Sequence, residues 1–467
     1  MKPITAYEYE EIEFPSKIPS KLVDEFKKIN KEYSKNKNEK RAIFDIYGTQ
    51  IKAKQFVGII KIGKYTIQIL PKLLSPNKNI NLKENSKKII EEEVKENNKY
   101  IISNLLYMLK YTKKLDLKET DLATLKKHDD LFEVIIYLFA KNLLERLKLD
   151  LVKNYEPREE NLNFLKGKIN FTKHIKHNLV NKAKFYSEYD DFTENNLLNQ
   201  IFKATIVKLL KITKSTENYK LLSTCNLILI DVPSKRIIYK DFQKVKLTRF
   251  TEKYRPSFDL AKLLLFGNSV ELSSKDISTF SILFDMNKLF EEFIYEFMKK
   301  EFSQEDLENN KIIDITSQSK KDNEVVFKEN NNLSNFSLKP DIIIEFDKNS
   351  KEINNNKLII DTKYKILKKD KKNLGVSNSD IYQMLAYGLR FFKDNNQNNK
   401  PFNNYKRIIL LYPNPDKKKV IKEKVISGYG ITEENIKIQV KTVNLGLNLK
   451  KDKNKLKKEL LEIIKGS

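Results

Sequence analysis

The sequence predicts a mixed α/β protein, α+β overall, in which an α/β core with a mixed sheet flanked by helices occupies the C-terminal part. Short apolar runs of strand length predict that buried sheet, and they lie at residues 339–346, 357–364, 407–412 and 436–444. Runs with apolar residues at helical spacing alternate with these strands, and they occupy residues 284–294, 379–388 and 450–465. Ahead of the core, the patterns predict a helical middle and a small β-rich N-terminal domain.

In the N-terminal half, the sequence patterns predict one helix, several strands and then longer helices. Apolar residues at helical spacing occur in 21–33 and 131–149, and strand patterns fill 43–51 and 56–70. Residues 74–99 are rich in Asn, Lys and Glu without a clear apolar face, which predicts a linker or a solvated insertion. We therefore divide the chain into three regions: residues 1–150, β-rich and then helical; 151–275, mixed and mainly helical; and 276–467, the C-terminal core.

Composition limits the class of protein. The chain has 467 residues and a formal net charge of +26. A basic surface attracts polyanions such as nucleic acid. The alternative is an AT-rich coding bias, which enriches lysine and produces such a charge without DNA binding. No apolar run approaches the ~20 residues of a membrane span, and the first residues lack the apolar stretch of a signal peptide. The single Cys225 excludes an internal disulfide, so we expect a cytoplasmic protein with no membrane partner.

Three polar side chains stand at informative places in the first two C-terminal strands. Asp341 opens the first strand, and Asp361 and Lys363 lie near the end of the second, where alternation directs both to one face and Thr362 to the other. Two carboxylates brought together can hold Mg²⁺, and a nearby lysine can orient water or neutralise a phosphate. This set is suited to phosphodiester hydrolysis. The alternative is a pair of edge strands with solvated charges.

The order Pro-Asp, a hairpin loop and then Asp-x-Lys resembles the PD-(D/E)xK nuclease superfamily. There a helical glutamate often completes the metal site, which implies Glu291 as a catalytic residue and a third ligand of Mg²⁺, or of Mn²⁺, beside Asp341 and Asp361; a solvated helix charge is the alternative for Glu291. One branch carries a Gln-x-x-x-Tyr helix close to the active site and the DNA. Gln383 and Tyr387 share one helical face, and the resemblance implies catalysis for the first and DNA binding for the second.

Two further segments bear on nucleotides and nucleic acid. Residues 58–64 match Gly-x4-Gly-Lys, most of a phosphate-binding loop, yet lack the Ser or Thr that would ligate Mg²⁺. Because period-two alternation follows, we expect a hairpin there and no nucleotide site in this chain. Arg249, Lys253 and Arg255 lie in a basic and aromatic segment ahead of a helix, a mix that can bind the backbone of double-stranded DNA; an ordinary loop is the alternative.

Widely spaced phrases together resemble the McrC family, the nuclease subunits of McrBC-type modification-dependent restriction systems. The most specific phrase is Phe-Asp-Met-Asn-x-Leu-Phe-Glu at residues 284–291. The other phrases lie at residues 56–60, 69–72, 163–169, 191–196, 340–341, 361–364 and 383–387. Together they span most of the chain.

The resemblance implies a division of labour between two proteins. The C-terminal part would cut DNA with a divalent metal bound by Asp341 and Asp361, and with Lys363 as the catalytic cation, in a system that recognises 5-methylcytosine and serves antiviral defence. Region 1–150 would dock on an oligomeric McrB-like AAA+ GTPase, which binds the GTP and which this chain stimulates. Two alternatives stay open: a non-catalytic DNA-binding adaptor that activates the NTPase, and a stand-alone repair nuclease of the same superfamily.

Overall fold

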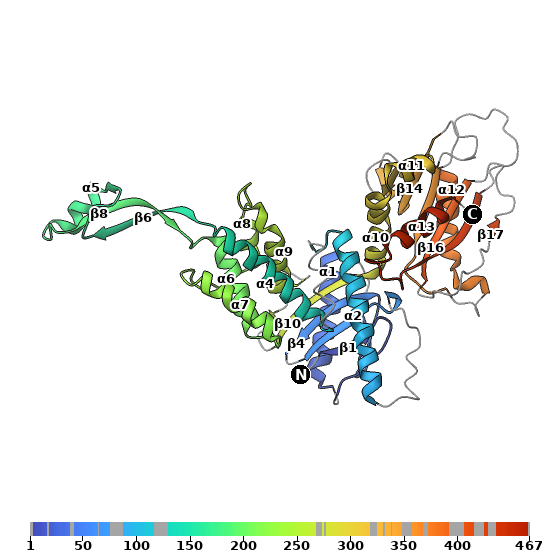
Figure 1. Ribbon diagram of the computed structural model, residues 1–467, viewed down its shortest axis with the longest axis horizontal. Helices are drawn as coiled ribbons and strands as arrows, with labels where there is room; N and C mark the ends of the chain where they lie inside the picture. The colour runs from blue at the N-terminus through green and yellow to red at the C-terminus, as the bar shows by residue number, and fades with distance from the viewer. Residues whose placement is uncertain are drawn as a thin grey trace.

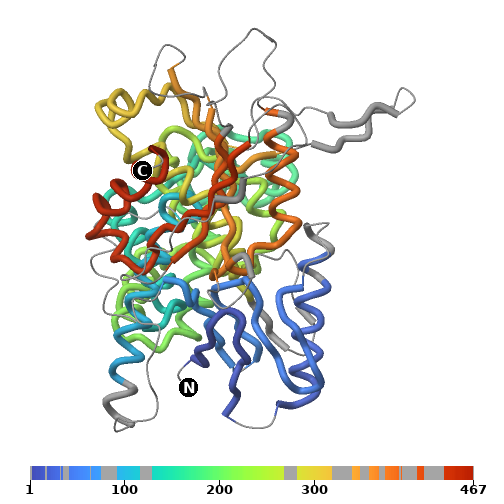
Figure 2. The backbone as a smooth tube through the Cα atoms, turned by 90° about the vertical axis from the view of Figure 1, so that its right-hand side faces the viewer, coloured from blue at the N-terminus to red at the C-terminus, as the bar shows by residue number. Residues whose placement is uncertain are grey.

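The structure is a computed structural model of the chain. It describes residues 3–15, 18–37, 42–63, 65–74, 87–115, 129–267, 273–274, 277–317, 325–329, 332–337, 339–347, 357–367, 372–391, 406–414, 425–427 and 436–465. Within these ranges the protein is a mixed α/β structure with several sheets, as the sequence predicts. The N-terminal segments (blue) and the C-terminal sheet (orange to red) occupy opposite ends of the view in Figure 2. No helix in the described ranges is both long and apolar enough to cross a membrane.

The first sheet combines N-terminal strands with a strand from much later in the chain. Its described strands follow the order β1-β5-β4-β10-β9, with the bounds β1 Ile4–Tyr7, β4 Phe56–Ile62, β5 Tyr65–Leu70, β9 Ser273–Ser274 and β10 Ile277–Asp285. β4 and β5 form an antiparallel hairpin, so the hairpin predicted in place of a phosphate-binding loop is confirmed. β10 pairs with β4, and Gly58 permits this contact, because a Cβ there would lie 2.0 Å from the carbonyl oxygen of Ile282.

One face of this sheet is covered by a helix and a small hairpin. They are α1 (Ser20–Lys37), β2 (Phe44–Tyr47) and β3 (Gln50–Ala53). The single strand predicted over 43–51 is wrong: the chain turns at Gly48, whose φ of +60° favours glycine, and two strands result. The apolar core beneath contains Phe26 and Phe44, whose rings meet edge to face with centroids 4.9 Å apart.

The other face of the sheet is covered by helices. The bounds are α2 Lys87–Tyr111, α4 Leu131–Leu149, α6 Leu197–Leu210, α7 Thr216–Ile228, α8 Tyr239–Lys244 and α9 Arg255–Phe266, with 3₁₀ turns η1 Lys72–Leu74 and η3 Glu252–Tyr254. The linker predicted for 74–99 is wrong in its second half, because residues 87–99 already belong to α2; residues 75–86 lie outside the described residues. Side-chain oxygens cap two of these helices, Asp130 for α4 and Asn196 for α6.

A long arm projects from the helical part. It consists of β6 (Asn154–Leu162), β7 (Lys168–Ile169), α5 (Phe171–Asn178) and β8 (Phe185–Thr193). β6 and β8 pair antiparallel along their whole length, and Figure 1 shows this twisted hairpin running away from the body with α5 near its end. Because the hairpin packs against little besides itself, its side chains are exposed or half-buried, with Ser187 buried.

The C-terminal part contains the second large sheet. Its described strands follow the order β11-β14-β15-β16-β18-β17, with the bounds β11 Ile312–Ser317, β14 Ile342–Phe346, β15 Lys357–Thr362, β16 Lys406–Asn414, β17 Val425–Ser427 and β18 Ile436–Asn444. A separate hairpin joins β12 (Val325–Glu329) and β13 (Asn332–Ser337). The helices are α10 Met286–Glu301, α11 Gln304–Asn309, α12 Asn378–Phe391 and α13 Lys453–Lys465, with a 3₁₀ turn η4 at Lys372–Gly375.

This sheet is mixed and lies between two helical layers, as predicted. β15 pairs antiparallel with β14 and parallel with β16. Leu358 and Ile360 face the core that contains α10 and α13, whereas Ile359 faces the core that contains α12. The first of these cores continues through α4 to β4, so the three regions predicted from the sequence share one apolar core. Their boundaries stay predictions.

Candidate active site

The β14–β15 hairpin brings the two predicted aspartates together. Because Ile342 pairs with Ile360, Asp341 lies beside the end of β15. The Oδ2 atom of Asp341 accepts hydrogen bonds from the backbone nitrogen and the hydroxyl of Thr362, at 2.7 and 2.8 Å. Asp361 is 1% exposed. Thr362 was predicted to face away from Asp361 and Lys363. Its hydroxyl holds Asp341 in place, a role that strand alternation alone did not indicate.

Lys363 joins this hairpin to α12 on one face of the sheet. Its Nζ lies 2.6 Å from Asp361 Oδ2 and donates to Gln383 Oε1 at 3.2 Å. Gln383 Nε2 donates to the Tyr387 hydroxyl at 2.7 Å, which donates to the carbonyl oxygen of Lys339 at 2.9 Å. The structure therefore brings Asp361, Lys363 and Gln383 together. Tyr387 is buried at 2% exposure, so its side chain holds Gln383 and has no surface for the predicted DNA contact.

The three basic residues predicted to contact DNA lie elsewhere, around the start of α9 in the helical part (Figure 1). Arg249 is exposed, Lys253 pairs with Asp150, and Arg255 pairs with Glu252. Two of these cations are therefore already matched by carboxylates within the chain. The structure does not bring them to the carboxylate cluster, and their contact with DNA stays a prediction.

Glu291 approaches the aspartates from α10, on the opposite side of the sheet from α12. Glu291 and Asp341 both line a cavity of about 340 Å³. The other described residues that line it are Thr112, Lys114, Glu292, Tyr295, Glu296 and Ser317. Burial, and then the charges of Asp341 and Glu292, raise the pKa of Glu291 to about 8. The carboxyl group is thus held where a negative charge is unfavourable unless a cation balances it.

Asp361 is shifted in the same direction. Burial, and then the neighbouring Asp341, raise the pKa of Asp361 to about 7, against the opposing influence of Lys363. Burial acts to lower the pKa of Lys363, but the charge of Asp361 outweighs it and the pKa is raised. Lys363 therefore stays protonated at neutral pH, whereas Asp361 and Glu291 compete for protons.

The donor set suits a hard divalent cation. Within the described ranges, no three Asp, Glu, His or Cys side chains converge closely enough to form a complete metal-binding group. Mg²⁺, however, binds through one or two carboxylates and keeps several waters. Asp361 Oδ2 is buried and, apart from its ion pair with Lys363, accepts no hydrogen bond of regular geometry from a described residue. Asp361 and Glu291, whose pKa values are raised, are carboxylates that such a cation would stabilise in their charged form. Together with the adjacent Asp341 they fit the predicted Mg²⁺.

A further contact, which the sequence did not indicate, ties the cluster to the N-terminal sheet. The hydroxyl of Tyr364, the residue after Lys363, donates to Glu8 Oε1 at 2.9 Å, and the backbone nitrogen of Lys72 donates to the same atom at 3.0 Å. Burial raises the pKa of Glu8 to about 7. Because 356 positions separate Glu8 from Tyr364, no local pattern could have revealed this pair.

Comparison with known proteins identifies relatives of the chain. A family model described as McrBC 5-methylcytosine restriction system component matches residues 51–413. A curated protein, the Type IV methyl-directed restriction enzyme EcoKMcrBC of Escherichia coli K12, is 24% identical over 211 residues, which are 43% of this chain. The chain spans 60% of the length of that relative.

Two solved structures from Thermococcus gammatolerans resemble this fold. A chain in the half-complex of McrB AAA+ hexamers with bound McrC has a TM-score of 0.69 and 24% identity, covering 99% of this chain and 100% of that one. A chain in the McrBC complex has a TM-score of 0.50 and 28% identity, covering 65% of this chain and 89% of that one. At 24% identity, the first likeness shows a shared fold over almost the whole chain.

Proposed function

We propose that this chain, which belongs to the family of McrBC 5-methylcytosine restriction system components, is the DNA-cleaving subunit of a modification-dependent restriction complex. One observation carries the proposal. Asp341, Asp361 and Lys363 meet at the end of one hairpin with Glu291 beside them, and the two carboxyl groups of Glu291 and Asp361 have raised pKa values. Structural ion pairs ordinarily lower carboxyl pKa values, whereas raised values are typical of sites built for an ion or a proton.

The residues of the site divide the work of phosphodiester hydrolysis. A bound Mg²⁺ would supply a water with a lowered pKa and would neutralise charge on the phosphate. Asp361 and Asp341 would hold that ion, with Glu291 completing the site from α10. Lys363, kept protonated by Asp361 and oriented by Gln383, would donate to a phosphate oxygen as negative charge develops. Tyr387 would fix Gln383 from behind.

The proposed partner is a McrB-like AAA+ GTPase, which would bind GTP and which this chain would stimulate. The related solved complex is described as McrB AAA+ hexamers with bound McrC, and this chain shows only a hairpin where its sequence approximates a phosphate-binding loop. The surface we assign to docking is the arm, outside the predicted region 1–150. Large apolar side chains are exposed along it: Tyr155, Phe164, Leu165, Phe171, Ile175, Leu179, Val180 and Phe192.

The arm assignment has a matched test. Tyr155 and Phe192 form an exposed cross-strand ring pair with centroids 4.8 Å apart. The double variant Tyr155→Ser/Phe192→Ser should weaken binding to the partner, measured by size-exclusion chromatography, and lower its GTPase rate. The control Tyr219→Ser, exposed on α7, should change neither. Full partner binding by the double variant would place docking elsewhere.

Plasmid cleavage tests the proposed function. The purified chain is incubated with Mg²⁺ and methylated or unmethylated plasmid, with and without the partner and GTP. We expect cutting only with the partner, the nucleotide and methylated DNA together. Cutting by the chain alone would instead indicate a stand-alone nuclease. GTPase stimulation without cutting under any condition would indicate a non-catalytic adaptor.

A further inference from the structure

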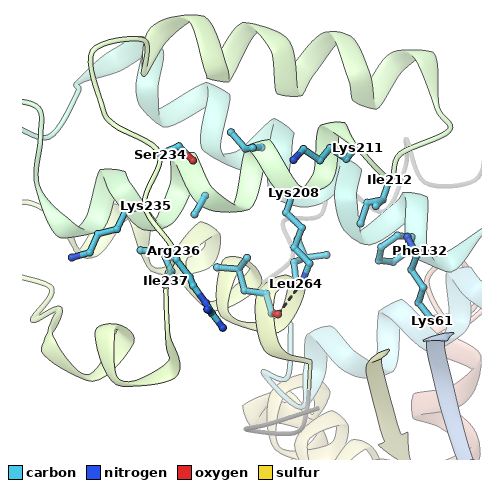
Figure 3. A pocket seen from close by; sticks show the side chains of 13 residues that line it. Lys61, Phe132, Lys208, Lys211, Ile212, Ser234, Lys235, Arg236, Ile237 and Leu264 are labelled. Carbon is cyan, nitrogen blue, oxygen red and sulfur yellow. Dashed lines mark hydrogen bonds between the residues drawn. The ribbon is translucent and has the colours of Figure 1, made fainter. Parts of the chain in front are cut away.

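A second cavity, of about 460 Å³, lies in the helical part and is lined by cationic side chains. They come from β4, from α6 and from the segment ahead of α8: Lys61, Lys208, Lys211, Lys235 and Arg236. Figure 3 shows them around an apolar wall that includes Phe132, Ile212 and Leu264. The described residues that line this cavity include no Asp or Glu. Its charge is therefore opposite to that of the cavity beside Glu291.

The ammonium group of Lys208 is one of the positive charges within this cavity. Its Nζ donates to the carbonyl oxygens of Leu264 and Leu265 at 3.0 and 2.9 Å, and Figure 3 shows the side chain reaching from α6 toward the end of α9. Burial, and then the charge of Lys61, lower the pKa of Lys208 to about 8. Burial, and then Lys214, also lower the pKa of Lys61. These shifts indicate positive charges that their surroundings leave incompletely balanced.

Glu133, the residue after Phe132, does not balance the positive charges of the cavity. Glu133 accepts hydrogen bonds of 2.7 Å from the Thr213 hydroxyl, from the backbone nitrogen of Lys214 and from the Asn218 side chain. Both of its oxygens are thus engaged in joining α4 to the start of α7, and it does not line the cavity. No carboxylate of the described residues lines the cavity, so an anionic ligand would complement its cations.

We propose that this cavity binds a small phosphate-bearing ligand through a di- or triphosphate group. Lys211 and Arg236 are exposed and form no ion pair with any residue that the structure describes, so both can close on an anion. The volume is in the range of small-molecule sites, roughly 300–1,000 Å³. A concave site with an apolar wall favours a compact ligand over a duplex, whose phosphates follow a convex surface. The site is separate from the GTP site proposed for the partner.

Calorimetric titration of the full-length chain, without partner or DNA, tests this proposal. The probes are GTP, ATP, inorganic triphosphate and a short DNA duplex. The variants are Lys211→Gln/Arg236→Gln and the control Lys220→Gln, which is exposed on α7. We expect the parent and the control to bind. The affinity of the double variant should be at least about tenfold lower, because it loses hydrogen bonds between charged groups. Tighter binding of nucleotides than of triphosphate would identify a nucleotide as the source; equal binding would identify a polyphosphate.

Three results would overturn the proposal: no binding of any probe by the parent, equal binding by the double variant, or binding only of a short DNA duplex that the double variant loses. The last result would make the cavity part of a DNA surface. Because no cleavage or partner enters the titration, failure of the proposed nuclease function would leave this outcome unaffected.

Discussion

Two cavities of this molecule are lined by opposite charges, and the pKa shifts of their charged groups have the same physical cause. In the cavity beside α10, burial and neighbouring carboxylates raise the pKa of Glu291. In the cavity beside α6, burial and a neighbouring ammonium group lower the pKa of Lys208. Both shifts weaken the charged form of the side chain. The direction of each shift therefore indicates the sign of the ligand that would restore it: a cation in the first cavity and an anion in the second.

The carboxylate cluster and the cationic cavity differ in how firmly their charged groups are held. Asp361 and Lys363 lie at the end of a central strand, and hydrogen bonds run from Lys363 through Gln383 to α12. By contrast, Lys211 and Arg236 are exposed side chains, the first directly after the end of α6 and the second on the segment ahead of α8. Chemistry requires fixed geometry, whereas binding tolerates side chains that adjust. The carboxylate cluster is thus suited to catalysis and the cationic cavity to recognition.

The largest expected effect is on the carboxylate side. Asp361→Asn should lower the rate of DNA cleavage by a factor on the order of 10²–10³ or more, because it removes a charge aimed at the reacting centre. The measurement is cleavage of methylated plasmid with the partner present. The matched control is Glu345→Gln on the same hairpin, where the carboxylate pairs with Lys357. Cleavage by Asp361→Asn at the parent rate would remove the carboxylate cluster from the mechanism.

The next largest effect concerns the fixed geometry of Lys363. Gln383→Leu should lower the cleavage rate by about 10- to 100-fold, the usual cost of losing a residue that orients a site. It should also lower the pKa of Lys363, since an acceptor of its protonated form is lost, and so shift the alkaline limb of the pH–rate profile downward. The control Tyr382→Phe alters an exposed residue of the same helix. A slower rate with an unchanged pH profile would indicate general damage to α12.

The raised carboxyl pKa values predict how stability depends on pH. Between pH ~4 and pH ~8 the folded state keeps protons that the unfolded state has lost, so the free energy of unfolding falls as pH rises through this window. In the absence of divalent ions, Glu291→Gln should therefore stabilise the protein at pH ~8 by about 1–2 kcal/mol, and by less at pH ~5. Urea denaturation with chelator measures this difference. Equal stabilisation at both pH values would show that the pKa of Glu291 is not raised in the folded protein.

Adding Mg²⁺ should counteract the fall in the free energy of unfolding with rising pH. If the ion binds the carboxylates in their charged form, the parent should gain stability at pH ~8 by mass action, and Asp361→Asn should gain little. The measurement is the urea midpoint with and without Mg²⁺. Parallel gains in both proteins would place the ion elsewhere on the chain.

The smallest predicted effect tests the link between the cluster and the N-terminal sheet. Tyr364→Phe removes one of the donors to the buried Glu8 and should lower the free energy of unfolding by about 1 kcal/mol. Tyr382→Phe, which removes an exposed hydroxyl, serves as the control in urea denaturation. No difference between these two variants would show that the Tyr364–Glu8 contact contributes nothing to stability.

The fold and the central part of the site follow from short patterns. Apolar strand runs and helical spacing predict the mixed sheet between helices, and Asp361 and Lys363 meet as strand alternation requires. A single residue upset the prediction for 43–51, because Gly48 permits a turn inside an apolar run. The helical start of α2 was missed because its polar residues show no apolar stripe.

Contacts between distant segments could not be predicted in this way. The return of β10 to the N-terminal sheet depends on Gly58, which lets two backbones approach closely. The Thr362 hydroxyl, the Glu8–Tyr364 pair and the burial of Tyr387 arise from side chains that the sequence does not place together. The cationic cavity assembles from β4, α6 and the segment ahead of α8, so its lysines look like ordinary solvated charges in a lysine-rich chain.

The most direct test of the site is a titration of the full-length chain with Mn²⁺, followed by electron paramagnetic resonance, for the parent, Asp361→Asn and Glu345→Gln. We predict that the parent and Glu345→Gln bind Mn²⁺ and that Mg²⁺ displaces it. The affinity of Asp361→Asn for Mn²⁺ should be at least about tenfold lower. Binding of Mn²⁺ by Asp361→Asn with the affinity of the parent would contradict the assignment of this cluster as the metal centre.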